Sequence, residues 1–220
     1  MVDYAKAIQR PFSDWKKYLI GCALYVIPFL NIITGIFASG YSVMCAKSAM
    51  KKDFKLPEWD DWGGMFVKGL LLMVIGIIYM LPAMIVGAIA GFTAAAAIFS
   101  GENWMTALGA VGALGGVAFL IILVTAYFLP AATMLFADKG NLGAAFEFGN
   151  VFKMALTGTY FVAWLITLLI LIGVGIVVGF VSALLAVTVV LPWAISAMFS
   201  MFSTIMAMSV FGQVYAEVKR

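Results

Sequence analysis

The sequence of 220 residues contains no histidine and few charged side chains. Without imidazole the chain cannot form a Ser-His-Asp or Cys-His catalytic pair, a histidine-bound zinc or haem site, or a histidine proton relay. Asp, Glu, Lys and Arg make up 10% of the residues, against about a quarter in a typical soluble domain. The two cysteines, Cys22 and Cys45, cannot form a disulfide framework. We therefore expect no enzyme activity, no cofactor and no bound metal.

The net charge of +3 is too small and too scattered to indicate binding to nucleic acid. Apolar residues, in contrast, make up 65% of the chain. A chain of this length cannot bury so much apolar surface in one water-soluble core, so lipid must solvate most of it. The composition therefore predicts an integral membrane protein whose first partners are membrane lipids.

Four charge-free runs define the expected transmembrane segments: 18–46, 69–101, 103–137 and 154–216. Crossing a membrane takes about 20 apolar residues in a helix. The second and third runs each supply one helix, and the fourth supplies two, with a break between Gly179 and Pro192. The sequence thus predicts an all-α membrane protein with four transmembrane helices after the first run, in a single domain over 1–220.

The first run allows two arrangements, a re-entrant hairpin of two half-helices or a single kinked span. If it crosses once, the four basic residues before it and the nine after it lie on opposite sides of the membrane. If it enters and returns, all thirteen lie on the cytoplasmic side, as the positive-inside rule favours. Pro28, Asn31, Gly35 and Gly40 interrupt the centre of the run, where a hairpin would turn. We prefer the hairpin, with basic loops and the C-terminus in the cytoplasm.

The N-terminal tail, residues 1–17, has helical periodicity of its own. Tyr4, Ile8, Phe12 and Trp15 recur at three- or four-residue spacing, opposite a mostly charged face. A basic face opposite aromatic residues is typical of a helix that lies in the membrane interface. We expect this segment to be an amphipathic anchor.

A possible internal repeat divides the chain into two related halves, 18–101 and 103–216. The motif Tyr-x-x-Pro occurs at Tyr25, Tyr79 and Tyr127, and Val189 begins a degenerate fourth copy. Related halves are common in membrane folds that hold a site between them. The alternative is that aromatic residues, glycine and proline recur by composition alone.

The chemically densest segment is an acidic-aromatic motif after the first run. It consists of Glu58, Trp59, Asp60, Asp61, Trp62 and Gly63. Its three carboxylates are the ligand type that Mg²⁺ or Ca²⁺ prefers, but they lack the spacing of a dedicated calcium loop. Because lysines flank the motif on both sides, we favour helix capping and lysine pairing.

The expected spans contain no central ionisable residue, which argues against proton coupling. Candidates for a polar pathway, or for helix packing, are Asn31, Thr34, Thr93, Thr125 and Thr167. Ridges of small residues permit close helix packing, within the monomer or in a homo-oligomer. These ridges are Ala83, Gly87, Gly91 and Ala95; Gly112 and Gly116; Gly175, Gly179 and Ala183; and Ser196, Ser200, Ser203 and Ala207.

Several strings in the first eighty residues resemble a known family. They include Asp14-Trp15-Lys16-Lys17-Tyr18-Leu19-Ile20-Gly21, Gly40-Tyr41 and Leu56-Pro57-Glu58-Trp59-Asp60-Asp61-Trp62-Gly63. With these strings the chain is similar to a prokaryotic, often archaeal, membrane-protein family, the domain of unknown function 4013. More distantly it resembles the membrane domain attached to some glycerophosphodiester phosphodiesterases, without their catalytic domain. The resemblance implies a prokaryotic cytoplasmic membrane and supplies no activity.

Three classes of function remain open. The favoured one is a non-enzymatic accessory, scaffold or lipid-organising protein, with a larger membrane protein as a possible partner. The alternative is a small permease or channel for a neutral solute or lipid, which would use the related halves and broken helices. An intramembrane enzyme is the third, for which the sequence offers no evident nucleophile-base pair.

Overall fold

The computed structural model describes residues 2–26, 31–100, 104–188 and 190–219, without the side chains of residues 31, 32, 104, 106, 107 and 110. Contacts divide the chain into two compact units. Unit 1 comprises Met1–Met73 and Pro130–Arg220, and unit 2 comprises Val74–Leu129. The two units are described separately.

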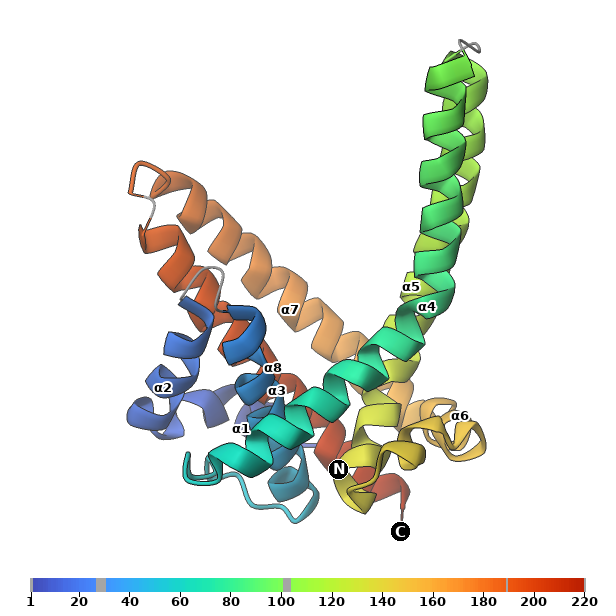
Figure 1. Cartoon of the computed structure of the whole chain (residues 1–220). Coiled ribbons are helices and arrows are strands. Elements are labelled where there is room, and N and C mark those ends of the chain that lie inside the picture. The colour runs from blue at the N-terminus through green and yellow to red at the C-terminus, as the bar shows by residue number, and fades with distance from the viewer. Residues whose placement is uncertain (1, 27–30, 101–103, 189, 220) are drawn as a thin grey trace. The chain divides into compact units, whose positions relative to one another are not determined.

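The described ranges are helical throughout, apart from turns and loops (Figure 1). The helices in chain order are α1 Tyr4–Gln9, η1 Arg10–Ser13, α2 Trp15–Val26, α3 Asn31–Met50, α4 Trp62–Ser100, α5 Trp104–Lys139, η2 Leu142–Phe146, α6 Phe148–Ala155, α7 Gly158–Leu184 and α8 Val190–Val218. Helices α4, α5, α7 and α8 are long and apolar enough to cross a membrane. The four predicted spans are therefore confirmed, and the chain is a multi-pass membrane protein. The fourth run breaks between α7 and α8, within the predicted interval.

The first apolar run forms two helices, α2 and α3, which fold back on each other. The Thr34 hydroxyl near the start of α3 donates to the Leu24 carbonyl near the end of α2 at 2.5 Å. At the other end of the pair, the Lys17 ammonium donates to the Leu56 carbonyl, which follows α3, at 3.1 Å. A single continuous helix would hold Thr34 and Leu24 about 15 Å apart along its axis, and Lys17 and Leu56 several tens of ångströms apart. The hairpin is therefore the arrangement that the chain adopts; Pro28, at its predicted turn, lies outside the described residues.

The N-terminal tail differs from the single amphipathic helix that its periodicity predicts. Pro11 has no backbone N–H, and the chain here forms the short α1, the 3₁₀ turn η1 and then α2. Asp14 begins α2, because its carboxylate accepts the backbone N–H of Lys17 at 3.2 Å. Phe12 and Trp15 remain exposed, as expected of an interfacial anchor. Arg10, however, belongs to the buried side of the tail and not to its basic face.

Helix α8 is the central helix of unit 1. It contacts α1, η1, α2, α3 and α7. In its most apolar stretch 44% of the residues are buried inside the protein, against 11% in the neighbouring α7, which lies beside it in Figure 1. Met201, Ile205 and Met206 are fully buried and fill the space between these helices. Helix α7 therefore leaves most of its surface uncovered by protein, whereas α8 is packed much more deeply.

Close helix contacts in unit 1 occur at glycines outside the predicted ridges. A Cβ atom on Gly40 of α3 would lie 1.8 Å from the Met65 carbonyl oxygen of α4, and one on Gly69 would lie 1.8 Å from that of Ile36. These two glycines let the backbones of α3 and α4 touch. At Gly212 of α8, a Cβ would lie 2.7 Å from the Ala46 carbonyl oxygen of α3.

In unit 2 the glycines of the predicted small-residue ridges make no close contact with another helix. In this unit the α4 and α5 segments form a pair, linked by the Thr125 hydroxyl donating to the Tyr79 carbonyl at 3.2 Å. A Cβ added at Gly87, Gly91, Gly112 or Gly116 would meet no atom within 4 Å. These glycines therefore do not hold the pair together. The division into related halves at 18–101 and 103–216 stays a prediction.

Helix α3 ends in a Schellman motif with a lysine at its left-handed position. The Asp53 N–H donates to the Ser48 carbonyl, and the Lys52 N–H donates to that of Ala49. Lys52 has φ of 61°, whereas a glycine, Gly140, occupies the left-handed position at the end of α5. Glycine adopts this conformation without the Cβ clash that a lysine suffers.

We expect Lys52→Gly to stabilise the protein by about 1 kcal/mol, because it removes the left-handed penalty on a side chain. The measurement is the free energy of unfolding in mixed detergent micelles. Lys51→Gly is the matched control, since it removes the same charge at a residue without positive φ. Equal effects of the two variants would contradict the assignment of strain to Lys52.

Candidate functional site

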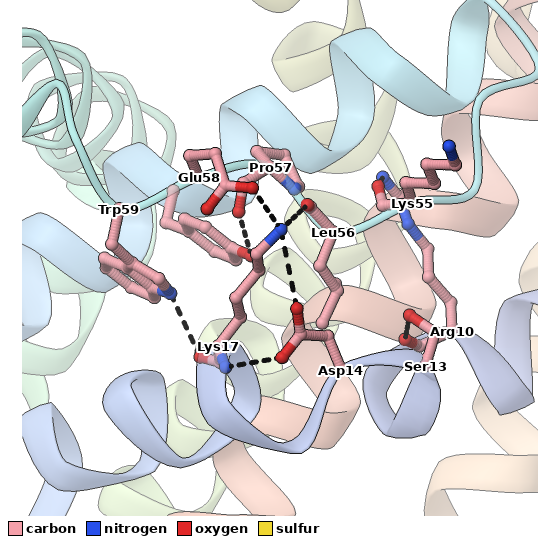
Figure 2. A network of polar contacts seen from close by, with 10 residues as sticks. Arg10, Ser13, Asp14, Lys17, Lys55, Leu56, Pro57, Glu58 and Trp59 are labelled. Atoms are coloured by element: carbon pink, nitrogen blue, oxygen red, sulfur yellow. Dashed lines mark hydrogen bonds and ion pairs between the residues drawn. The ribbon is translucent and has the colours of Figure 1, made fainter.

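The polar chemistry of unit 1 begins with a network around Lys17, at the start of α2 (Figure 2). The Lys17 ammonium donates to the Glu58 carboxylate at 2.5 Å and to the Leu56 carbonyl at 3.1 Å, and lies 3.5 Å from the Asp14 carboxylate. The lysine side chain is largely shielded from solvent, while Glu58 is mostly exposed. The network therefore fastens the loop after α3 to the start of the hairpin.

The two tryptophans of the acidic-aromatic motif attach the same loop to α3. The Trp59 ring stacks on Tyr41 with centroids 3.9 Å apart, and its indole N–H donates to the Lys17 carbonyl at 3.0 Å. The Tyr41 hydroxyl in turn donates to the Pro57 carbonyl. Trp62 packs edge-on against Phe37 of α3. Trp59 and Trp62 thus hold the loop against α2 and α3.

Asp61 caps α4, as the favoured interpretation of the motif predicts. Its carboxylate accepts the Gly64 N–H at 2.8 Å and pairs with Lys68 at 3.4 Å. Asp60 accepts the backbone N–H of Asp61 at 2.9 Å. Gly63 lies open, since a Cβ there would meet no atom within 4 Å. Lysines and backbone N–H groups therefore bind Glu58 and Asp61, and the three carboxylates of the motif do not share one partner.

Hydrogen bonds lower the pKa of five described carboxyl groups at this end of unit 1, Asp3 and Asp138 among them. The Gly64 N–H lowers the pKa of Asp61, the Lys17 N–H that of Asp14, and the Lys139 ammonium that of Glu147. A carboxyl group whose pKa falls on folding stabilises the protein at pH values above its unfolded pKa, about 4. This contribution is lost as the pH falls from there through the folded pKa.

We therefore expect the melting temperature to be insensitive to these groups between pH 7 and about pH 5, and to fall below about pH 4. The combined variant Asp61→Asn/Glu147→Gln should make this acid limb shallower, since Asp14 and the other carboxyl groups remain, and it should keep the cap of α4, because asparagine also caps helices. Thermal melts across this pH range provide the measurement. An acid limb of unchanged depth in the variant would contradict the assignment.

Arg10 is buried at the junction of η1, α3, α8 and the loop. Its side chain is 1% exposed, and its guanidinium donates to the Cys45 carbonyl and the Ser209 hydroxyl at 2.9 Å each. It also donates to the Lys55 carbonyl at 3.0 Å and to the Ser48 hydroxyl. All four acceptors are neutral, so no carboxylate balances the buried positive charge. The hydrogen bonds of this one side chain join α3, α8 and the loop after α3. Sequence periodicity placed Arg10 with the solvated basic residues and gave no sign of this role.

Further charged side chains pair at the same end of unit 1. Asp138, near the end of α5, accepts hydrogen bonds from Lys219 and from the Tyr215 hydroxyl of α8. Lys139 pairs with Glu147 at 2.5 Å, before α6. The Asp3 backbone N–H donates to the Gln213 side chain of α8 at 2.7 Å. Four segments thus meet at one end of unit 1: the tail, the loop after α3, the end of α5 and the end of α8. They carry most of the basic residues, and this region is called the basic end.

Two neighbouring hollows lie within this basic end. The first, the lysine hollow, has a volume of about 380 Å³. Its lining includes Lys47, Lys51, Lys55 and Lys68, with Ser48 and one carboxylate, Asp53. The second, the apolar groove, has a volume of about 420 Å³ and lies between α3, the start of α4 and the end of α5. Its apolar lining includes Val43, Met44, Val67, Leu71, Phe136 and Ala137.

The two hollows share three lining residues, Met44, Lys47 and Lys68. Lys68 is the lysine that pairs with Asp61. Within the described ranges no carboxylate forms an ion pair with Lys47, Lys51 or Lys55. These three lysines are exposed, and Lys47 also interacts electrostatically with Asp138.

The four threonines predicted as a polar pathway are absent from the lining of these hollows, as far as the structure describes it. Thr34 bonds to α2 in unit 1, and Thr167 of α7 is buried with a hydroxyl that has no partner among the described residues. In unit 2, Thr125 bonds across to α4, and Thr93 donates to the Ile89 carbonyl of its own helix. The side chain of Asn31 lies outside the described residues. The identification of these residues as a pathway stays a prediction.

Sequence reasoning missed the lysine hollow, although its lysines were counted for topology. A usable signal was present, because Lys47 and Lys51 are one helical turn apart at the end of α3 and Lys55 and Lys68 flank the acidic-aromatic motif. The apolar groove left no such signal, since three helices from distant parts of the sequence form it.

Comparison with known proteins identifies one family. The model of the family described as "Protein of unknown function (DUF4013)" matches residues 20–187. No curated protein and no solved structure matches the chain. The more distant resemblance to the membrane domain of glycerophosphodiester phosphodiesterases therefore stays a prediction. The family match covers well over half of the sequence and includes the hairpin, the acidic-aromatic motif and three of the four spans, so the chain belongs to the DUF4013 family.

Proposed function

We propose that this protein is a non-enzymatic, lipid-organising component of a prokaryotic cytoplasmic membrane. The single observation that carries the proposal is the lysine hollow, which places unpaired lysines beside a groove with an apolar lining. Basic side chains at the ends of transmembrane helices attract the anionic lipids of the cytoplasmic leaflet. The protein would gather such lipids around its basic end.

The distribution of charge supports this orientation. The hairpin returns the chain to the side from which it came, so the residues before α2 and after α3 lie at one end of unit 1. Short loops rich in lysine and arginine are retained in the cytoplasm. The basic end, the loop 51–61 and the C-terminus would therefore contact the inner leaflet and the cytoplasm.

A scaffold role is the second part of the proposal. The glycine ridges of unit 2 leave helix faces on which another transmembrane helix would find no Cβ obstacle. Such a helix would come from a second copy or from a larger membrane protein. The protein can be extracted without detergent in styrene–maleic acid particles. A mass of the extracted protein above that of one chain would reveal either partner.

The test of lipid organisation is the lipid content of the protein extracted from its native membrane in styrene–maleic acid particles. The proposal expects anionic phospholipids to be enriched relative to particles that hold an unrelated four-span protein from the same membrane. Equal lipid compositions would overturn it. Selective permeability of proteoliposomes to a neutral solute, without lipid enrichment, would instead favour the permease.

A further inference from the structure

We infer that the lysine hollow and the apolar groove together form a binding site for one anionic phospholipid, with the phosphate among Lys47, Lys51 and Lys55 and one acyl chain in the groove. This inference rests on the proposed function and names the ligand of the site. The ligand is a lipid because the two hollows differ in chemistry and share Met44, Lys47 and Lys68 in their linings. A soluble phosphate compound would use only the first.

The lysine hollow has the charge that a phosphate requires. Four lysines line it against one carboxylate, Asp53, whose side chain already accepts the Lys55 N–H at 3.0 Å. Lys68 is partly neutralised by Asp61 at 3.4 Å, and Lys47 interacts electrostatically with Asp138 at the end of α5. Lys51 and Lys55 form no ion pair within the described ranges. Lysine ammonium groups bind phosphate as flexible point charges, and their long stems can adjust to one headgroup. The Ser48 hydroxyl also lines this hollow.

The groove continues from the hollow toward the apolar part of the helices. Lys68 lies six residues into α4, about 9 Å along its axis, and Leu71 lies one turn deeper. Val67, Leu71 and Phe136 offer an apolar surface of the kind that a hydrocarbon chain prefers to water. The shared residues Lys47 and Lys68 stand at the boundary, where the glycerol of a phospholipid would lie.

The entrance to the groove is kept open by glycine. Gly63 lines the groove, and a Cβ at this position would meet no protein atom within 4 Å. A larger side chain there would therefore fill space that the protein does not use. This gives a substitution that obstructs the proposed acyl chain without disturbing the packing around it.

The experiment titrates phosphatidylglycerol and phosphatidylcholine separately into the delipidated full-length protein and counts bound lipids by native mass spectrometry. We expect one tightly bound phosphatidylglycerol for each chain and at least tenfold weaker binding in Lys47→Gln/Lys51→Gln, since each lysine contributes roughly fivefold. The control, Lys16→Gln/Lys153→Gln, removes the same charge from exposed lysines that do not line either hollow, and should bind within twofold of the wild type. Gly63→Leu should also weaken binding while leaving the melting temperature unchanged.

Two results would overturn the inference while leaving the proposed function intact. Equal weakening in the two lysine pairs would show attraction to net charge and no defined site. Full binding by Gly63→Leu would show that no acyl chain enters the groove. A wild-type protein that binds both lipids equally would overturn the inference and also count against anionic-lipid organisation.

Discussion

Replacing Arg10 by methionine should lower the free energy of unfolding by about 3 kcal/mol or more. The guanidinium holds acceptors on α3, α8 and the loop after α3, and its loss leaves buried carbonyl and hydroxyl oxygens without a donor. Arg10→Lys should recover only part of the loss, because one ammonium cannot span acceptors on three segments. Reversible unfolding in mixed detergent micelles measures both variants.

The control for this prediction is Lys16→Met, which also replaces a basic residue by methionine, at an exposed position of α2. Its stability should stay within about 0.5 kcal/mol of the wild type. A buried charge is costly to desolvate, and an apolar replacement is neutral in some proteins. Wild-type stability in Arg10→Met would therefore contradict the role of Arg10 as the connector of these segments.

The second large effect is expected at the contact between α3 and α4. Gly40→Ala and Gly69→Ala should each destabilise the protein by about 3 kcal/mol or more, since the new Cβ would lie 1.8 Å from a backbone oxygen. A flexible side chain could move away from the new Cβ, but a backbone oxygen cannot, so α3 and α4 must separate. The Trp62 contact with Phe37 bridges the same helices, so a change in tryptophan fluorescence should accompany the loss.

Gly87→Ala and Gly91→Ala are the controls for these glycines. Both positions lie within α4, and a Cβ there meets no atom within 4 Å. Alanine should be tolerated or should stabilise the helix by up to about 1 kcal/mol. A loss at Gly87 as large as that at Gly69 would show that the ridge packs against a helix after all.

The spans and the hairpin could be predicted because each depends on a property that is read along the sequence alone. The length of a charge-free run determines whether a helix can cross the membrane, and the basic residues on both sides of 18–46 favour a return. The break between α7 and α8 followed from the length of the fourth run in the same way. These rules need no knowledge of how one helix is rotated against another.

The buried arginine and the close glycines could not be predicted, because both depend on the register between helices. Periodicity assigns Arg10 to a solvated face, and only the position of Ser209 and Cys45 opposite it makes burial possible. Rules for small residues search for i and i+4 spacing on one helix. Gly40 and Gly69 instead stand singly on two helices, each opposite a carbonyl of the other.

The acidic-aromatic motif was predictable in part. Capping by Asp61 could be inferred from an acidic residue before an apolar run, and the structure places its carboxylate on the Gly64 N–H. The stacking of Trp59 on Tyr41 required the hairpin to bring α3 beside the loop. Local chemistry was therefore predictable from the motif, and its tertiary partner was not.

The most direct test of the account is the sidedness of the basic end in the intact membrane. In a background with Cys22 and Cys45 replaced by alanine, single cysteines at Lys16, Lys51 and Lys139 report on the basic end, and one at Thr188 reports on the link between α7 and α8. A membrane-impermeant maleimide added to intact cells should label only the Thr188→Cys variant, and all four after the cells are opened. Labelling of Lys16→Cys from outside, with Lys51→Cys protected, would place the tail across the membrane from the loop and contradict the account.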